Sequence, residues 1–228
     1  MYQPSPEILD KYADILVNFA LNSGQGIKKG EIVQISLPEC AKPLMAPLIQ
    51  KILKAGAHYI LNYQPEGVSK LFFENASPEQ ITFAPRPYLL QKVKTFDHSI
   101  SILSTDDKYE LKNIDPQLIM SRSKALKFYS DAFRKKETQG NFTWTLGLYG
   151  TPAMAKAAKL SLEAYWQQII EACYLDQAKP VKKWQQVFGQ IESIRQALNQ
   201  LKIDQLHITG QDIDLQVKVG QDRNWVGG

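Results

Sequence analysis

The sequence predicts an α/β fold: a mostly parallel sheet with helices on both faces, followed by a helical segment and a β-hairpin that begins a second, truncated domain. Three observations lead to this prediction. Short β-branched and aromatic runs alternate with helical patterns over the first 150 residues, the order of βαβ units and therefore of a parallel sheet. Helical patterns alone follow. A period-two alternation of apolar and polar residues then appears near the end of the chain.

The first strand–helix–strand unit occupies residues 31–63. Ser5-Pro6 is a typical start of a helix, and apolar residues recur after it at helical spacing. The run 31–37 has the composition of a strand and is stopped by Pro38. Apolar residues on one helical face follow from Pro43, with Gly56 where the cap of a helix belongs. A second strand is predicted at 58–63.

The same alternation continues with looser spacing. We expect a helical region around 78–94, a strand at 99–103, a helix over about 116–136 and a strand at 142–148. Strands this apolar cannot leave one face in water. The sequence therefore predicts helices on both faces of the sheet.

The last third of the chain changes character. Apolar stripes at helical spacing lie within 162–173 and 184–201. We expect them to be core, with an interface as the alternative. Alternation around Gly210 then predicts a β-hairpin with one apolar face, which is not stable alone. We therefore predict an N-terminal α/β domain over 1–201 and the start of a second, truncated C-terminal domain over 202–228.

Composition excludes several classes of protein. Hydrophobic residues make up 44% and charged residues 22% of the 228 residues, as in ordinary globular proteins. The net charge of +4 is spread in short clusters such as Arg134–Lys136, without the basic, aromatic-rich surface of a nucleic-acid binder. No window reaches the roughly 20 apolar residues of a membrane span, and the first helix is unlike a secretion signal. We expect no nucleic-acid or membrane partner and a cytoplasmic location.

The metal-ligating residue types are too scattered to predict a site. His58, His98 and His207 are each expected in or beside a separate strand, and no two have the spacing of a metal-binding pair such as His-Glu-x-x-His. Structural roles are the better interpretation. Cys40 and Cys173 are too few and too far apart for a disulfide framework or a zinc site, so we expect two buried free thiols.

No other pattern indicates catalysis. The glycines of Ser23–Gly26 precede a strand instead of following one, which is the wrong order for a phosphate cradle. Asp106-Asp107 and the pair Asp212/Asp214 are expected in turns or at the solvated surface, although Asp212 and Asp214 could face a cleft. The sequence predicts no catalytic, cofactor-binding or metal-binding residue in this chain.

The end of the chain carries an ordered set of short motifs. Leu206–Leu215 reads Leu-His-Ile-Thr-Gly-Gln-Asp-Ile-Asp-Leu, and Val219-Gly220 and Arg223–Trp225 follow. This order resembles the strand pair that opens the catalytic domain in the aminopeptidase T / aminopeptidase S family of metallo-aminopeptidases. Ile213 departs from the pattern, because the family usually has threonine there. Four earlier segments resemble the family's first domain in the same order: Lys11–Ala13, Gly30–Val33, Ala55–Ala57 and Tyr149–Ala153.

The resemblance implies a metal-dependent peptide hydrolase. In the full-length enzyme it implies two divalent metal ions, zinc or cobalt, a peptide substrate and a homodimer. The family's metal ligands lie downstream of the segment that matches Arg223–Trp225, beginning with a glutamate after a Gly-x-Asn-x-Pro stretch. This chain ends before that stretch, so the resemblance implies that the metal-binding half is absent and that the 228 residues alone are inactive. The family's first domain is understood to cover the catalytic domain and to take part in dimerisation.

Two functional hypotheses follow. The first is the N-terminal part of a metal-dependent aminopeptidase, which removes N-terminal residues from peptides. The alternative is a free-standing α/β binding or self-association module without catalysis. A nucleotide-binding protein ranks last, because the fold would suit it but the required glycines are missing.

Overall fold

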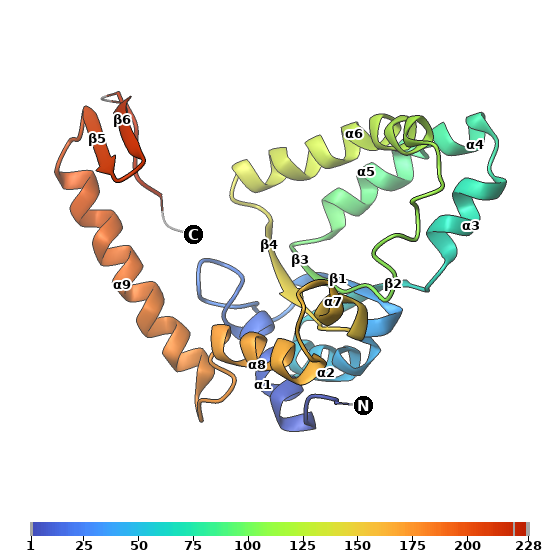
Figure 1. The fold of residues 1–228 in the computed structure, drawn as a ribbon, viewed down its shortest axis with the longest axis horizontal. Coiled ribbons are helices and arrows are strands. Elements are labelled where there is room, and N and C mark those ends of the chain that lie inside the picture. Colours follow the sequence, from blue (N-terminus) through green and yellow to red (C-terminus); the bar gives the residue numbers. More distant parts are fainter. Residues whose placement is uncertain (1, 221, 227–228) are drawn as a thin grey trace. The chain divides into compact units, whose positions relative to one another are not determined.

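The computed structural model of the protein describes residues 2–220 and 222–226. The chain divides into two compact units, residues 1–181 and 182–228. The first contains a four-stranded sheet, and the second contains a two-stranded sheet (Figure 1). The helix α9 (Pro180–Gln200) begins at the division between them.

The large sheet is parallel throughout. Its strands are β1 (Ile32–Pro38), β2 (His58–Gln64), β3 (His98–Leu103) and β4 (Thr143–Leu148). They lie in the order β2-β1-β3-β4, and every pair is parallel. All four predicted strands are confirmed. The chain moves from β1 to β2 in one direction and then returns to place β3 on the other side of β1, so the strand order reverses between β1 and β3.

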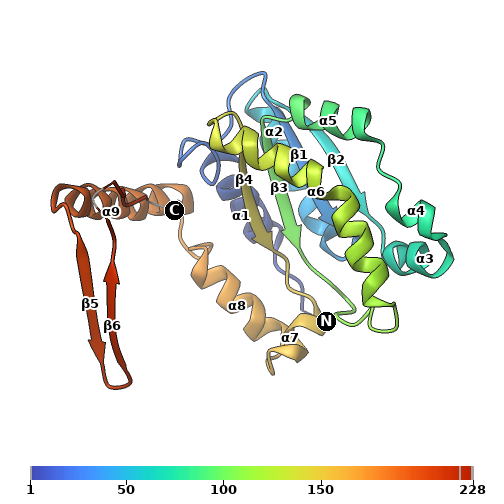
Figure 2. The same cartoon turned by 90° about the horizontal axis from the view of Figure 1, so that it is seen from above.

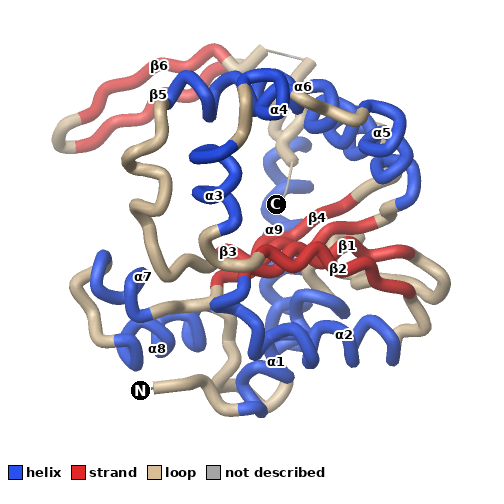
Figure 3. Tube along the Cα trace, turned by 90° about the vertical axis from the view of Figure 1, so that its right-hand side faces the viewer, coloured by secondary structure: helices blue, strands red, loops and turns tan. Residues whose placement is uncertain are grey.

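One face of the sheet forms the hydrophobic core. The side chains of Val33, Ile35 and Ile100 have no exposed surface on this face. Three helices lie on this side in Figure 3: α1 (Pro6–Asn18), α2 (Met45–Lys54) and α8 (Leu162–Ala172). The side chain of Ser5 caps α1 by accepting a hydrogen bond from the N–H of Ile8, and Pro6 occupies the first helical turn, as the sequence predicts.

The other face of the sheet is more polar. Two helices lie over it, α5 (Arg86–Thr95) and α6 (Pro116–Thr138) (Figure 3). The Nζ atom of Lys136 donates hydrogen bonds to the carbonyl oxygens of Val93 and Phe96 at 3.0 and 2.6 Å, which fastens α6 to the end of α5. A cavity of about 440 Å³ lies under α6 and is lined from the sheet by Gln34, Ser36, Ser99, Ser101 and Trp144. The prediction of helices on both faces is confirmed.

The connection between β2 and β3 differs from the predicted single helical region at 78–94. It contains α3 (Val68–Asn75), which was not predicted, then α4 (Pro78–Thr82) and α5. Pro85 separates α4 from α5, because a residue that precedes a proline disfavours helical geometry and the proline itself has no N–H to donate. The helix predicted from Pro43 likewise begins as the 3₁₀ helix η1 (Glu39–Leu44) before α2.

The second unit contains the predicted hairpin. Strands β5 (Gln205–Gly210) and β6 (Ile213–Lys218) pair antiparallel, with Gly210 opposite Ile213. Four of its apolar side chains are 38–47% exposed, namely Ile208, Ile213, Leu215 and Val217. The described part of the chain therefore does not bury this face. The predicted domain boundary at residue 201 stays a prediction; Gln221, Gly227 and Gly228 of the predicted second domain lie outside the described residues.

Two shorter observations complete the fold. The helix α7 (Pro152–Ala157) links β4 to α8 and is capped by the hydroxyl of Thr151, which accepts a hydrogen bond from the N–H of Met154. In the described residues, no helix combines the length and the apolar character needed to cross a bilayer.

Candidate functional site

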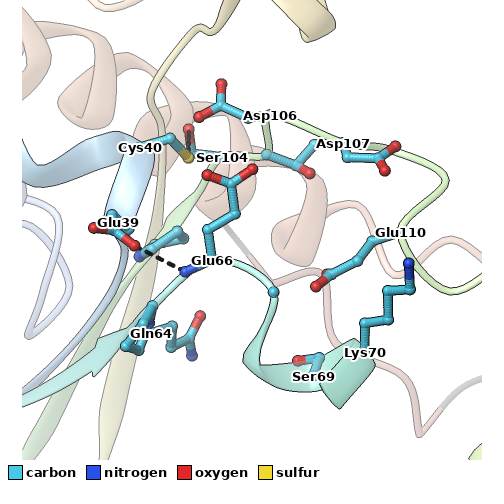
Figure 4. A pocket seen from close by; sticks show the side chains of 14 residues that line it. Glu39, Cys40, Gln64, Glu66, Ser69, Lys70, Ser104, Asp106, Asp107 and Glu110 are labelled. Atoms are coloured by element: carbon cyan, nitrogen blue, oxygen red, sulfur yellow. Dashed lines mark hydrogen bonds between the residues drawn. The ribbon is translucent and has the colours of Figure 1, made fainter. Parts of the chain in front are cut away.

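A cavity of about 340 Å³ lies where β1, β2 and β3 end (Figure 4). Its walls come from the segments that follow each strand, beginning at Pro38, Gln64 and Ser104. In open α/β sheets, ligands bind outside the carboxyl ends of the strands at the point where the strand order reverses. The cavity occupies this position between β1 and β3. It is the candidate functional site of the first unit.

The cavity is acidic. One ammonium group, that of Lys70, lines it together with five carboxylates: Glu39, Glu66, Asp106, Asp107 and Glu110. Figure 4 shows that these side chains come from three different segments of the chain. The backbone N–H of Glu66 donates a hydrogen bond to Oε2 of Glu39 at 2.9 Å, which holds the loops after β1 and β2 together. Such a surface attracts cations and repels anions.

The thiol of Cys40 lies at the edge of the cavity. Its Sγ atom donates a hydrogen bond to Oγ of Ser104 at 3.0 Å, and that hydroxyl donates to the carbonyl oxygen of Tyr149 at 2.8 Å. Burial raises the pKa of the Cys40 thiol. Since only the thiolate is a strong nucleophile, this geometry indicates a structural thiol that links β1 to the ends of β3 and β4.

One carboxylate oxygen in the cavity is unusual. The Oε1 atom of Glu110 is buried and has no hydrogen-bond partner, an arrangement that costs free energy in the folded state. No histidine lines the cavity, so it has no imidazole for proton transfer. The cavity has the charge of a cation-binding surface, and carboxylates are the titratable side chains that dominate its lining.

The three histidines lie in separate strands, as predicted. His98 is 3% exposed, and its ring nitrogens lie 2.8 Å from Oγ1 of Thr143 and 2.8 Å from Oε2 of Glu31. This satisfies the ring completely, so the structural interpretation of His98 is confirmed. His58 is exposed at the start of β2, and His207 pairs with Asp214 across the hairpin.

The remaining residues singled out in the sequence are also separated. Neither Cys40 nor Cys173 forms a disulfide, as predicted, but both are half-buried, so the expectation that they are buried was wrong. Asp106 and Asp107 lie in a loop, as predicted, but they line the cavity. Asp212 lies in the turn of the hairpin.

Within residues 2–220 and 222–226, no three His, Cys, Asp or Glu side chains are grouped so that they could hold a metal ion. The described residues therefore do not fit the metal centre that the resemblance implies.

The cavity itself was not predicted from the sequence. Glu39 directly follows β1 and Asp106 follows β3, and the carboxyl ends of neighbouring parallel strands meet at one edge of a sheet. This placement of acidic residues after strands was the signal available in the sequence. The predicted absence of catalytic, cofactor-binding and metal-binding residues stays a prediction.

The fold is therefore a parallel α/β domain followed by an open hairpin. A family model described as thermophilic metalloprotease (M29) matches residues 5–228. The chain belongs to this metalloprotease family, and the resemblance to aminopeptidases T and S is confirmed.

Individual relatives agree with the family. The chain is 22% identical to aminopeptidase AmpS of Bacillus subtilis over 96% of its own length and 55% of that protein. It is 23% identical to aminopeptidase T of Thermus aquaticus over 97% of its length and 56% of that protein. The solved structure of wild-type AmpT from Thermus thermophilus superposes with a TM-score of 0.76 at 22% identity, covering 92% of this chain and 53% of that one. The fold is thus shared, and the chain spans about half the length of these relatives.

Proposed function

We propose that these 228 residues are the N-terminal part of a metal-dependent aminopeptidase that removes N-terminal residues from peptides. The observation that carries the proposal is the family match, which runs from residue 5 to residue 228 and therefore includes the hairpin as well as the sheet domain. The proposal places the two divalent metal ions, zinc or cobalt, on residues outside these 228.

Two structural observations support the proposal that the metal ligands lie outside these 228 residues. The described residues offer no group of ligands for a metal ion, although the family is one of metalloproteases. The hairpin also presents apolar side chains, including Leu215 at 44% exposure, and a two-stranded hairpin needs further strands or a helix to be stable. We propose that 202–228 opens the catalytic domain and that further residues of that domain cover this face. The expected cytoplasmic location belongs to the same proposal.

Peptidase assays test the proposal. The 228-residue protein is incubated with aminoacyl p-nitroanilides in the presence of added zinc or cobalt. We expect no turnover and no tightly bound metal by elemental analysis after dialysis. Robust, metal-dependent turnover by this chain alone would contradict the claim that the metal ligands lie outside it.

The DNA beyond codon 228 separates the proposal from its alternative. A reading frame that continues into a Gly-x-Asn-x-Pro stretch and a glutamate supports the aminopeptidase, and expression of that longer frame should give metal-dependent activity. A genuine stop codon, with no activity under any metal, would favour the free-standing binding or self-association module.

A further inference from the structure

The face of the large sheet that lies under α6 has an unusual composition (Figure 2). Side chains alternate between the two faces along a strand, and the residues of β1 and β3 that face the core are buried. Those between them face α6 and are all polar, namely Gln34, Ser36, Ser99 and Ser101. In the register of the two strands, Gln34 lies opposite Ser99 and Ser36 opposite Ser101. The four side chains form one block, about 5 by 7 Å between Cα positions, where a parallel sheet is ordinarily apolar.

Most side chains of this block have no partner in the protein. The Nδ2 atom of Asn62 donates a hydrogen bond to Oγ of Ser36 at 3.4 Å. Within residues 2–220 and 222–226, the side chains of Gln34, Ser99 and Ser101 make no hydrogen bond to another protein group. They line the cavity of about 440 Å³ under α6, a volume typical of small-molecule sites. An apolar ligand would desolvate these groups without replacing their hydrogen bonds, at a cost in free energy.

Aromatic rings form the walls of the same cavity. Three of them come from α6 and from the residue before β4: Tyr129, Phe133 and Phe142. The ring centroids of Phe133 and Phe142 lie 4.7 Å apart. The fourth ring is that of Trp144, which lies beside Ser99 on the neighbouring strand. Its Nε1 atom donates a hydrogen bond to Oε1 of Glu137 at 2.7 Å, so the indole is held in one orientation although it is 50% exposed.

The charges that line this cavity cancel. Among its described lining residues, Arg134 and Glu137 are the charged ones. The Arg134 guanidinium lies 3.5 Å from the carboxylate of Asp131, and the Glu137 carboxylate accepts the hydrogen bond from Trp144. A phosphate group would require an uncompensated cation, and a cationic ligand would require an uncompensated carboxylate. The electrostatics of the cavity therefore favour an uncharged ligand.

We propose that this cavity binds an uncharged sugar ring, with its hydroxyl groups on Gln34, Ser99 and Ser101 and a C–H face against the indole of Trp144. Hydroxyl groups both donate and accept hydrogen bonds, which suits a floor of serine hydroxyls and one amide. The C–H faces of the same ring are apolar and pack on aromatic rings. Because Ser99 and Trp144 are neighbours across two strands, a single ring can reach both. The ring could belong to a saccharide or to the ribose of a nucleoside.

The first experiment is a ligand-observed NMR titration of the 228-residue protein with methyl pyranosides and, separately, with adenosine and uridine. We expect millimolar dissociation constants, with the strongest saturation transfer to the C–H protons of the sugar ring. Binding of the pyranosides assigns the site to a saccharide, and binding of the nucleosides alone assigns it to ribose. Adenosine monophosphate or glucose 6-phosphate should bind no more tightly than its uncharged parent. Tighter binding of the phosphates, or no binding by any uncharged probe, would overturn the proposal.

The second experiment locates the bound ring. Ser101→Ala and Trp144→Leu should each raise the dissociation constant of the bound probe by about three- to tenfold, the loss of one hydrogen bond or one aromatic contact. The matched controls are Ser123→Ala, on α6, and Tyr109→Leu, at a side chain that is 65% exposed. Neither residue lines the cavity, so both controls should bind as the wild type does. Circular dichroism checks that all four variants are folded.

Two outcomes of this second experiment would contradict the proposal. One is equal binding by the cavity variants and their controls, which would place the probe elsewhere. The other is displacement of the sugar by alanyl-alanine amide at similar concentrations, which would assign the hydroxyl groups of the cavity to a peptide. The proposal does not depend on the catalytic assignment, so a failure in the peptidase assay leaves these outcomes unchanged.

Discussion

The imidazole of His98 joins the starts of three strands, and its Nε2 atom lies 2.8 Å from Oε2 of Glu31. The same carboxylate oxygen accepts a hydrogen bond from the backbone N–H of Lys28 in the turn before β1. Burial raises the pKa of Glu31, but the hydrogen bonds from Lys28 and His98 outweigh that effect, so the net pKa is lowered. The pair of Glu31 and His98 therefore holds the amino ends of the strands together. The acidic cavity lies at the opposite edge of the sheet, where the strands end.

Glu31→Gln should destabilise the protein in a pH-dependent way. A carboxyl group whose pKa is lowered on folding stabilises the native state above its unfolded pKa, about 4.3, and loses this contribution as the pH falls through its folded value. We expect the variant to be about 1–2 kcal/mol less stable at pH 7, the scale of a charged hydrogen bond, with the difference shrinking below about pH 4. Urea unfolding at several pH values measures it. The exposed Glu163, changed to Gln, is the control, and a constant difference at every pH would contradict the assignment.

Tyr12→Phe should cost about 1–3 kcal/mol of folding free energy. Tyr12 is 3% exposed, and removing its hydroxyl leaves the N–H and carbonyl of Leu148 without that partner. Denaturant unfolding followed by circular dichroism checks this value. Tyr109→Phe is the control, because Tyr109 is 65% exposed. A loss no larger than that of the control would show that water replaces the hydroxyl.

Both cysteines should react slowly with iodoacetamide in the native protein. Burial raises the thiol pKa of Cys40 and of Cys173, so the thiolate fraction near neutral pH is small. We expect native rates several-fold below those of the urea-unfolded chain, still rising above about pH 8.5, the ordinary thiol pKa. Mass spectrometry of the Cys40→Ser and Cys173→Ser variants assigns each rate. A rapid reaction of Cys40 at pH 7 would mark it as an activated nucleophile.

The hairpin should exchange its amide protons faster than the large sheet. Its strands expose their apolar side chains, and local opening is easiest where few apolar side chains are buried. Hydrogen exchange read by mass spectrometry should show peptides from 204–219 exchanging well before those containing β1 and β3. If the amides of 204–219 were as protected as those of β1 and β3, the prediction would be wrong. The hairpin would then have to pack against a partner.

Much of the fold could be predicted because its strongest signals are local. The strand β1 is a run rich in isoleucine and valine between Gly30 and Pro38, β3 places isoleucine at alternate positions, and α1 begins at a Ser-Pro start signal. The helix α3 escaped prediction because no residue in it is buried. Helical periodicity arises when one face meets a core, and the consecutive apolar residues Leu71, Phe72 and Phe73 define no single face.

The acidic cavity could be predicted only in part. Glu39 and Asp106 follow strands, and such positions are readable from the sequence once the strands are placed. Their proximity depends on the strand order β2-β1-β3-β4, which local patterns do not determine. Glu110 is a harder case, since it lies in the long connection between β3 and α6 and reaches the cavity only through the path of that loop.

The bond between Tyr12 and Leu148 spans 136 positions of the chain, and this has a consequence during synthesis. A ribosome adds about 5–20 residues per second, so α1 leaves it roughly 7–30 s before its partner strand is made. The side of α1 that carries Tyr12 is without that strand throughout this interval. The contact between Tyr12 and β4 can therefore form only after at least 148 residues of the chain have been made.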